Sequence, residues 1–294
     1  YTLGLRISDD LTANDNLDLR LSLQRSDVFG GPVSDAAYAS ILPTGAVAFE
    51  GDDVRKRYTG APGATMEQIN TQRMEGTARW TRRFNESTNS ILTASAVKQT
   101  QDSFYETNDY ANFNETFYAD GRLNYSLSDA WLLTGGLDAR HEILRSSSYT
   151  YSQLPTYKPD DFDFMAAGLY AQATWTPNAK FEMAMVGRLD HLTVNWRGQT
   201  ALENEVDGFV LVPRLHMRWN MSPVLTSRLS VGQGYRAPLT FFESEHGILD
   251  KGYDVAVNNI ERSNSAVYSL SFDNERTTST VSVVDLTVEL SRET

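Results

Sequence analysis

Apolar and polar residues alternate along most of this chain. The alternation is clearest over residues 113–127 and 131–143, where most odd positions carry Phe, Leu, Trp or Ala and most even positions carry Asn, Asp, Arg, Thr or Glu. A period of two residues indicates a β-strand with two unlike faces. Because only Ser128, Asp129 and Ala130 separate the two segments, they are predicted to form an antiparallel hairpin.

The same alternation recurs from end to end, and turn signals divide it into about twelve strands. Their connections alternate between turns of a few residues and loops of roughly ten to forty residues. Residues 27 to about 65 and the polar, tyrosine-bearing stretch between about 101 and 113 are predicted loops. In the last predicted strand the apolar face comprises Val284, Leu286, Val288 and Leu290, opposite Asp285, Thr287 and Glu289.

The strand over residues 225–238 shows the two faces most plainly. Its apolar face is predicted to hold Leu225, Leu229, Val231 and Tyr235. The other face is predicted to hold Thr226, Arg228, Ser230, Gly232, Gly234 and Arg236. The strand ends at Ala237 and Pro238, and a polar loop follows to about residue 262.

Strand length and tryptophan position distinguish a membrane barrel from a soluble β-sandwich or propeller, which can show the same alternation. The predicted strands span about twelve to eighteen residues, whereas soluble strands usually have about five or six. Trp80, Trp131, Trp175 and Trp219 each lie near a short turn on the apolar face. That placement is typical of an aromatic girdle at a membrane interface. The pattern therefore favours an antiparallel up-and-down transmembrane β-barrel with its apolar faces outward.

Composition narrows the class of protein further. No stretch approaches 18 consecutive apolar residues, which excludes a transmembrane helix. Hydrophobic residues make up 40% of the chain, a low value for a soluble domain, and there is no cysteine. With a net charge of −12 and basic residues scattered singly, the chain lacks the clustered cations that a nucleic-acid partner requires.

Four segments resemble the barrel domain of TonB-dependent outer-membrane receptors. Residues Gly234, Tyr235, Arg236, Ala237 and Pro238 match that family's R-A-P motif with its preceding glycine and aromatic residue. The segments G-L-Y-A-Q-A-T-W-T-P at 168–177, V-G-R-L-D-H at 186–191 and V-P-R-L-H at 212–216 precede the motif in the family's order. The resemblance covers about residues 110 to 290, and it is poor at Glu261-Arg262-Ser263, where the family has a P-E-K-S-like run.

The resemblance implies a bacterial outer-membrane receptor. Such a receptor binds a scarce solute, such as a siderophore or other metal chelate, a vitamin or a glycan, and imports it with energy from the TonB complex. Its partners are outer-membrane lipid, a plug domain inside the barrel, TonB acting through that plug, and the small solute ligand. The family implies a transporter that requires no cofactor.

The resemblance also implies a larger barrel than this chain can form. The family's barrel has 22 strands and an N-terminal plug, no plug is recognisable here, and the terminal aromatic residue of complete barrels is missing. Residues 1–294 are therefore predicted to be one domain, a partial barrel cut at both ends. Its first and last strands, Tyr1 to Asp9 and Thr278 to Leu290, should not pair. The rival hypothesis is a complete, passive porin or surface-interaction barrel of about twelve strands, which would pair them.

The candidate ligand-facing residues follow from these faces. Arg236 is predicted to point inward at the loop end of its strand, and the next loop carries Phe241, Phe242, Glu243, Glu245 and His246. Mixed aromatic and acidic loops suit ligand capture. The alternative for Arg236 is structural, an ion pair with an inner carboxylate such as those of Asp138, Glu142 or Asp190.

No constellation of residues in the sequence predicts an enzyme or a metal site. His141, His191, His216 and His246 are far apart in the sequence, and three of them lie within predicted strands. Asp160, Asp161 and Asp163 lack the glycine and terminal glutamate of a calcium-binding loop, which favours a solvated acidic loop. No serine has the G-x-S-x-G context of a hydrolase nucleophile.

Overall fold

A single antiparallel sheet makes up the part of the protein that the structure describes. The computed structural model describes residues 1–30, 67–105, 108–147, 161–197, 205–237, 239, 260–274 and 277–289. Within these ranges every regular element is a β-strand. None of the described segments is a helix long and apolar enough to cross a membrane.

The twelve strands are long, as the sequence predicts. They are β1 (Thr2–Thr12), β2 (Asp15–Gly30), β3 (Glu67–Arg83), β4 (Thr88–Tyr105), β5 (Asn108–Ser128), β6 (Trp131–Ser147), β7 (Phe162–Asn178), β8 (Phe181–Trp196), β9 (Glu205–Ser222), β10 (Leu225–Arg236), β11 (Glu261–Asp273) and β12 (Thr278–Glu289). The two-residue turns Ala13-Asn14, Asp129-Ala130 and Ala179-Lys180 lie at the same end of the sheet, called here the short-turn end. The opposite end is called the long-loop end.

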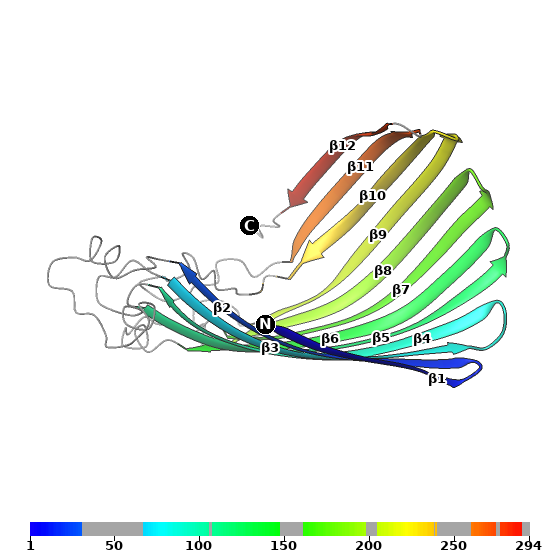
Figure 1. Cartoon of the computed structure of the whole chain (residues 1–294). Helices are drawn as coiled ribbons and strands as arrows, with labels where there is room; N and C mark the ends of the chain where they lie inside the picture. Colours follow the sequence, from blue (N-terminus) through cyan, green and yellow to red (C-terminus); the bar gives the residue numbers. More distant parts are fainter. Residues whose placement is uncertain are drawn as a thin grey trace.

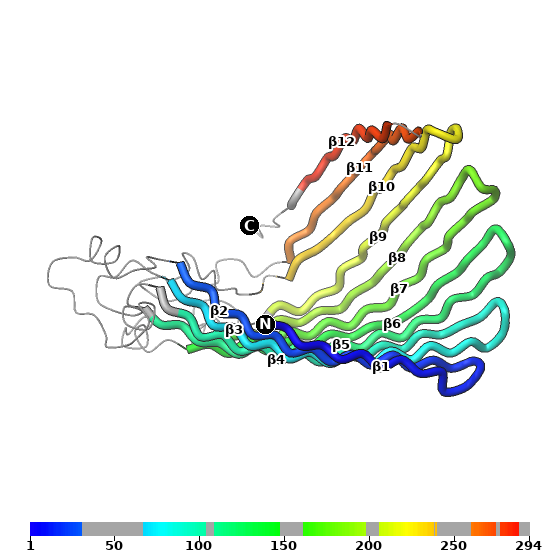
Figure 2. The backbone as a smooth tube through the Cα atoms, viewed as in Figure 1, coloured from blue at the N-terminus to red at the C-terminus, as the bar shows by residue number. Residues whose placement is uncertain are grey.

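Each strand pairs with its neighbours in sequence, so the sheet is an up-and-down meander in the order β1 to β12. The sheet curls into part of a cylinder, and its two edge strands lie well apart (Figure 1, Figure 2). Over the described residues, no ladder joins β1 to β12. This confirms the predicted open sheet, except that Leu290 lies outside the described residues. A sheet closes only if the tilt and stagger of its strands bring the edges together.

In the polar stretch predicted as a loop between about 101 and 113, all the described residues are strand, which corrects the sequence analysis. β4 and β5 stay paired up to Tyr105 and Asn108, and the Ser103 hydroxyl donates to the Tyr110 carbonyl over 3.1 Å. The prediction failed because it assigned a strand only where one face of the segment is apolar. A strand that extends beyond the apolar band needs backbone partners but not apolar side chains.

The face assignment of β12 is also corrected. Ser265 on β11 pairs with Leu286, and Val267 pairs with Val284, so Val284 and Leu286 lie on the same inner face as Ser265. Asp285 pairs with Ala266 on the outer face. The sequence was ambiguous because Val281 and Val283 give β12 apolar residues in both phases, and the register with β11 decides between them.

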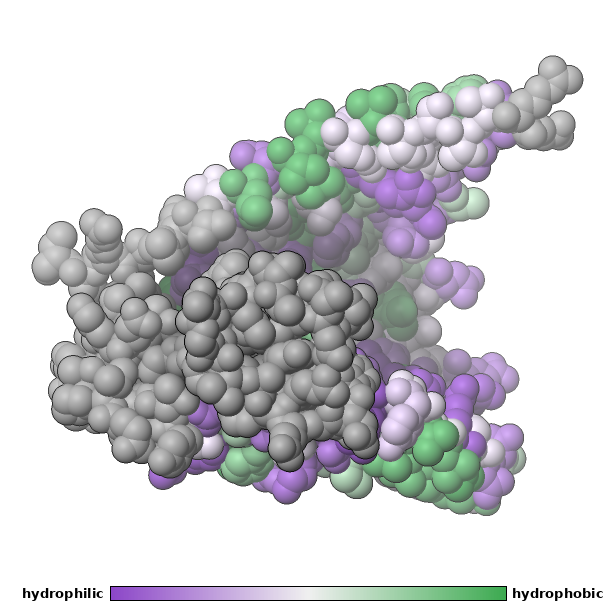
Figure 3. All heavy atoms as spheres, turned by 60° about the vertical axis from the view of Figure 1, so that its left-hand side comes forward, coloured by the Kyte–Doolittle hydropathy of each residue, from purple (hydrophilic) through white to green (hydrophobic). Residues whose placement is uncertain are grey.

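The outer face carries an apolar band. Leu137 and Leu169 expose 67% and 61% of their surface on it, and hydrophobic residues lie along the outside of the curved wall while its concave side is mostly hydrophilic (Figure 3). Near the short-turn end, the rings of Trp131 and Trp175 stack with centroids 5.9 Å apart, and Phe181 meets Trp175 edge-on at 5.7 Å. These contacts form the predicted girdle.

The length of the apolar band fits a membrane. Trp175 and Met165 lie at its two ends on β7, ten residues apart. At about 3.3 Å per residue and a strand tilt of about 40°, this spacing gives a height of about 25 Å, which is the height of the apolar band in outer-membrane barrels. Beyond the band the outer face carries ion pairs, with Lys98 Nζ 3.1 Å from Glu115 Oε1 and Arg197 Nε 2.6 Å from Asp163 Oδ2.

The buried core lies on the inner face at the long-loop end. It forms one cluster comprising Leu144, Phe162, Phe164, Ala166, Leu192, Val194, Trp196, Val206, Val210, Val212 and Ala237. Leu192 and Val194 are fully buried. The inner face therefore changes along its length, from charged at mid-strand to apolar near the long loops.

Candidate ligand-binding site on the inner wall

A cavity of about 580 Å³, called here the vestibule cavity, opens on the inner face beside the apolar cluster. Strands β5, β6, β7, β8 and β10 and the residues after β10 line it. Its walls combine aromatic residues, arginines and carboxylates: Tyr118, Phe162, Phe164, Tyr235, Arg140, Arg188, Arg236, Asp138 and Glu142. A concave site with an apolar body and a few polar groups is the usual form of a small-molecule site.

Arg140 is fixed at one side of this cavity. Its guanidinium pairs with the Glu142 carboxylate, and Asn114 Nδ2 donates to Glu142 Oε1 over 2.9 Å. The Arg140 guanidinium carbon also lies 5.6 Å from the centroid of the Phe164 ring, a cation–π distance. A cation stacked on an aromatic ring presents a flat surface that is both apolar and positively charged.

Arg188 is the centre of the polar network below the cavity. Its Nη1 and Nη2 donate to Asp138 Oδ2 and Oδ1 over 2.5 and 2.9 Å, a bidentate pair across β7. Its Nε donates to Asp190 Oδ2 over 2.8 Å. Asp190 is fully buried and Asp138 nearly so. Since a buried carboxylate is costly unless paired, one arginine stabilises two of them.

Two long side chains cross a neighbouring strand to build the network, and a glycine makes room for each. Arg188 passes over Gly168, where an added Cβ would lie 2.1 Å from Asp190 Oδ1 and 2.5 Å from Arg188 Nη2. Tyr170 passes over Gly136, where a Cβ would lie 2.5 Å from the Tyr170 hydroxyl. That hydroxyl donates to Asp120 Oδ2 over 2.7 Å. At both positions only glycine allows the approach.

Tyr235 lies on the inner side, which corrects its predicted place on the apolar outer face. It lines the vestibule cavity and packs against the buried cluster of the inner face, on the side of the Asp190 carboxylate. The β9–β10 ladder ends at Gly232, whereas β10 stays paired with β11 as far as Arg236. Because the end of β10 is not paired with β9, its side chains can depart from strict alternation between the two faces. The phenol hydroxyl finds a carboxylate inside, and hydrocarbon outside would offer it no partner.

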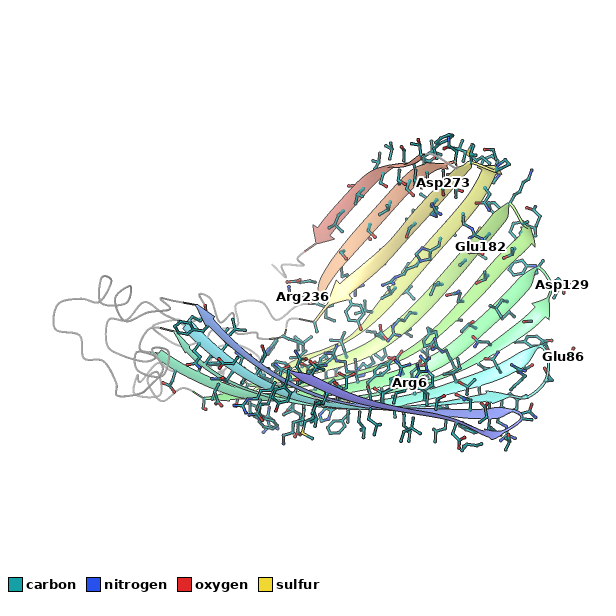
Figure 4. All side chains as sticks on the ribbon, viewed as in Figure 1. Arg6, Glu86, Asp129, Glu182, Arg236 and Asp273 are labelled. Atoms are coloured by element: carbon teal, nitrogen blue, oxygen red, sulfur yellow. The ribbon has the colours of Figure 1, made fainter. Side chains whose placement is uncertain are left out.

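The structure places part of the predicted site. Arg236 lies at the long-loop end of β10 (Figure 4) and lines the vestibule cavity with Ala237. Gly234 pairs with Ser263 on β11. Pro238 and the loop residues Phe241, Phe242, Glu243, Glu245 and His246 lie outside the described residues. Of the carboxylates considered as partners of Arg236, Glu142 pairs with Arg140, and Asp138 and Asp190 pair with Arg188. Ligand contact by Arg236 stays a prediction.

The histidines considered as metal ligands have other contacts. His191 Nε2 lies 2.6 Å from Asp207 Oδ1, and His216 Nδ1 lies 3.0 Å from Ser230 Oγ. His141 is exposed on the outer face, and His246 lies outside the described residues. Over the ranges that the structure describes, no group of three metal-ligating side chains is present.

Of the acidic residues after 159, Asp161 and Asp163 are built into the wall rather than a solvated loop. Asp163 lies on β7 and pairs with Arg145 and Arg197, and Asp161 Oδ1 accepts the Ser146 amide over 2.7 Å. Asp160 lies outside the described residues.

Sequence analysis missed several residues of the cavity. The sequence analysis singled out none of Phe162, Phe164, Tyr118 and Arg140, all of which line the cavity. A usable signal was present in β8, where Leu192, Val194 and Trp196 continue in the same phase as Asp190. An inner face that turns apolar near its loop end indicates an enclosed site there.

Comparison with solved structures shows the same fold in three receptors and transporters. FauA, the alcaligin outer membrane receptor from Bordetella pertussis, gives a TM-score of 0.64 at 12% identity over 97% of this chain and 43% of FauA. FyuA, the ferric yersiniabactin uptake receptor from Yersinia pestis, gives 0.63 at 12% identity, over 98% and 44%. The FrpB iron transporter of Neisseria meningitidis (F5-1 variant) gives 0.67 at 12%, over 98% and 44%.

At these identities the similarity is one of fold, and the chain spans less than half the length of each of these receptors. No curated protein matches the sequence. Residues 2–289 do match the family described as TonB dependent receptor-like, beta-barrel. With its open meander of twelve long strands, outer aromatic girdle and charged inner wall, the chain belongs to the TonB-dependent receptor β-barrel family.

Proposed function

We propose that this chain forms part of the barrel wall of a bacterial outer-membrane receptor that imports a scarce solute with TonB-derived energy. The observation that carries the proposal is the vestibule cavity, a concave aromatic and arginine-rich site at the long-loop end of the inner face. The family match and the apolar band of about 25 Å support the outer-membrane location. The structural neighbours are iron and copper transport receptors rather than enzymes.

The whole receptor would contain more than this chain. The open sheet and the coverage of 43–44% of FauA and FyuA support a longer barrel wall that continues beyond β1 and β12. By analogy with the family, a plug domain would occupy the lumen and contact TonB, and outer-membrane lipid would cover the apolar band. The solute would bind among the long loops and in the vestibule cavity before the plug moves.

An uptake assay tests this function. Bacteria producing the full-length receptor, with and without a functional TonB complex, are supplied in turn with radiolabelled ferric siderophores, cobalamin, copper and oligosaccharides. The proposal predicts accumulation of one of these classes of solute that stops when TonB function is removed. Accumulation that is indifferent to TonB would favour the passive porin instead.

A variant links uptake to the cavity. Arg236→Ala removes a charged lining residue and should weaken binding of the transported solute about tenfold or more, because one charge-assisted hydrogen bond contributes about 1.5–3 kcal/mol. Arg228→Ala is the matched control, since Arg228 lies on the same strand and donates to Ser271 Oγ, away from the cavity. Equal effects of both variants would contradict a role for the vestibule cavity.

A further inference from the structure

A groove crosses the outer face of the wall, on the side opposite to the vestibule cavity. It has a volume of about 620 Å³, is lined by residues of β1 to β7, and is called here the outer groove. The side chains that line it from the outer face are apolar except that of His141, which lies at its edge. The outer groove therefore lies within the apolar band.

The floor of the outer groove crosses four neighbouring strands. Ala94 on β4 pairs with Ala78 on β3 and with Ala119 on β5. Ala119 pairs in turn with Ala139 on β6, and all four residues line the groove. Three strand spacings of about 4.8 Å give this floor a length of about 14 Å. Because the strands of a barrel are tilted, the floor runs obliquely through the apolar band.

Larger side chains border this floor. On β6, Leu137 and His141 are the nearest residues on the same face on either side of Ala139. On β5, Phe117 pairs with His141 and continues that border, with 49% of its surface exposed. Neighbouring residues on one face of a strand are about 7 Å apart, so the gap is about one side chain wide. A single hydrocarbon chain fits such a gap, whereas an α-helix is about 10–12 Å across.

Two cations lie just beyond the groove, towards the long-loop end. Lys98 is the next outer-face residue of β4 after Ala96, which lines the groove. Lys98 Nζ lies 5.5 Å from the centroid of the Phe113 ring and 3.1 Å from Glu115 Oε1. Arg145 on β6 pairs with Phe113 in the β5–β6 register. Lys98 and Arg145 therefore lie on either side of one aromatic ring, at the boundary of the apolar band.

The cluster around Arg145 carries an excess of positive charge. Arg145 and Arg197 share one carboxylate, that of Asp163. The neighbouring Asp161 carboxylate instead accepts the Ser146 amide and hydroxyl over 2.7 and 3.0 Å. Arg197 exposes 62% of its side chain. An anionic group at this boundary would therefore meet exposed positive charge directly above an apolar groove.

We propose that the outer groove binds one acyl chain of an anionic membrane lipid, whose phosphate group lies beside Lys98. The floor of about 14 Å is about half of the hydrocarbon core of a bilayer, which is the depth of one leaflet. A phosphate accepts charge-assisted hydrogen bonds from Lys98 and from Arg145 where the chain leaves the apolar band. The inference rests on the proposed function in placing the wall in the outer membrane.

The test measures lipid binding to the full-length receptor, delipidated in detergent, by native mass spectrometry. The probe is phosphatidylglycerol, and phosphatidylcholine with the same acyl chains is the reference. The proposal predicts one molecule of phosphatidylglycerol bound in preference to phosphatidylcholine. Ala119→Leu fills the floor and should weaken this binding at least about tenfold. Ala171→Leu is the matched control and should weaken it less than about twofold, because Ala171 lies on the outer face between Gly135 and Gly187, outside the groove.

A second pair of variants tests the headgroup contact. Lys98→Gln should reduce the preference for phosphatidylglycerol about threefold, as expected for one exposed charge pair. Lys180→Gln, at the short-turn end, should leave that preference unchanged. Equal affinity for the two lipids, or equal effects of Ala119→Leu and Ala171→Leu, would overturn the proposal. The measurement does not require transport, so failure here is distinguishable from failure of TonB-dependent uptake.

Discussion

Replacing Gly168 with alanine tests whether the Arg188 crossing holds the inner wall together. The new Cβ would lie 2.1 Å from Asp190 Oδ1, 2.5 Å from Arg188 Nη2 and 3.0 Å from Arg188 Cζ. Real Cβ atoms do not approach other atoms so closely, so both the carboxylate and the guanidinium must move. Asp190 is fully buried and can shift little, whereas Arg188, with 30% of its side chain exposed, has room to swing away.

The expected loss of stability follows from the contacts that Arg188 gives up. If its guanidinium swings off Gly168, the bidentate pair with Asp138 is lost and Asp138 remains buried without its cation. Breaking a buried ion pair costs about 3–5 kcal/mol. Because Arg188 is partly solvated and keeps one bond to Asp190, we expect a loss of about 3 kcal/mol for Gly168→Ala. Reversible urea unfolding of the receptor in lipid vesicles measures it.

Gly187→Ala is the matched control, because a Cβ at Gly187 meets nothing within 4 Å on the adjacent strand. Its effect should stay within about 0.5 kcal/mol. In an Arg188→Gln background, the cost of Gly168→Ala should fall, since the crossing side chain is gone and only the clash with Asp190 remains. Equal costs for the two glycines, or an undiminished cost in that background, would refute the reasoning.

Two further predictions concern the outer face and the second crossing. Leu169→Arg should destabilise the protein in vesicles by about 2–4 kcal/mol near the bilayer midplane. Gln172→Arg on the inner face should change the free energy of unfolding little. Equal costs of the two variants in urea unfolding would indicate a soluble sandwich with a dry core on one side. Tyr170→Phe removes the 2.7 Å bond to Asp120 and should cost about 1.5–3 kcal/mol. Tyr125→Phe on the exposed outer face should cost under about 0.5 kcal/mol in the same titration.

The sequence alone determined the class of fold. Period-two alternation, short turns and tryptophans beside those turns sufficed for an up-and-down barrel wall, because each is a local property of one strand or hairpin. The open sheet was predicted through the family resemblance of residues such as Tyr235 and Arg236, and the pairing order confirms it. What alternation could not provide was the phase of β12, where Val283 and Val284 fit opposite faces equally well.

Only the tertiary structure decided the candidate site. Arg188 meets Asp138 on a strand two positions away, and Tyr235 meets Asp190 across β9, contacts that depend on register and curvature rather than on neighbouring residues. Gly168 appears in the sequence as one small residue within a strand, yet it decides whether a guanidinium can cross. A strand's own sequence determines its two faces. A site on the wall of a barrel depends instead on how several strands are placed side by side, and that arrangement is set only when the sheet forms.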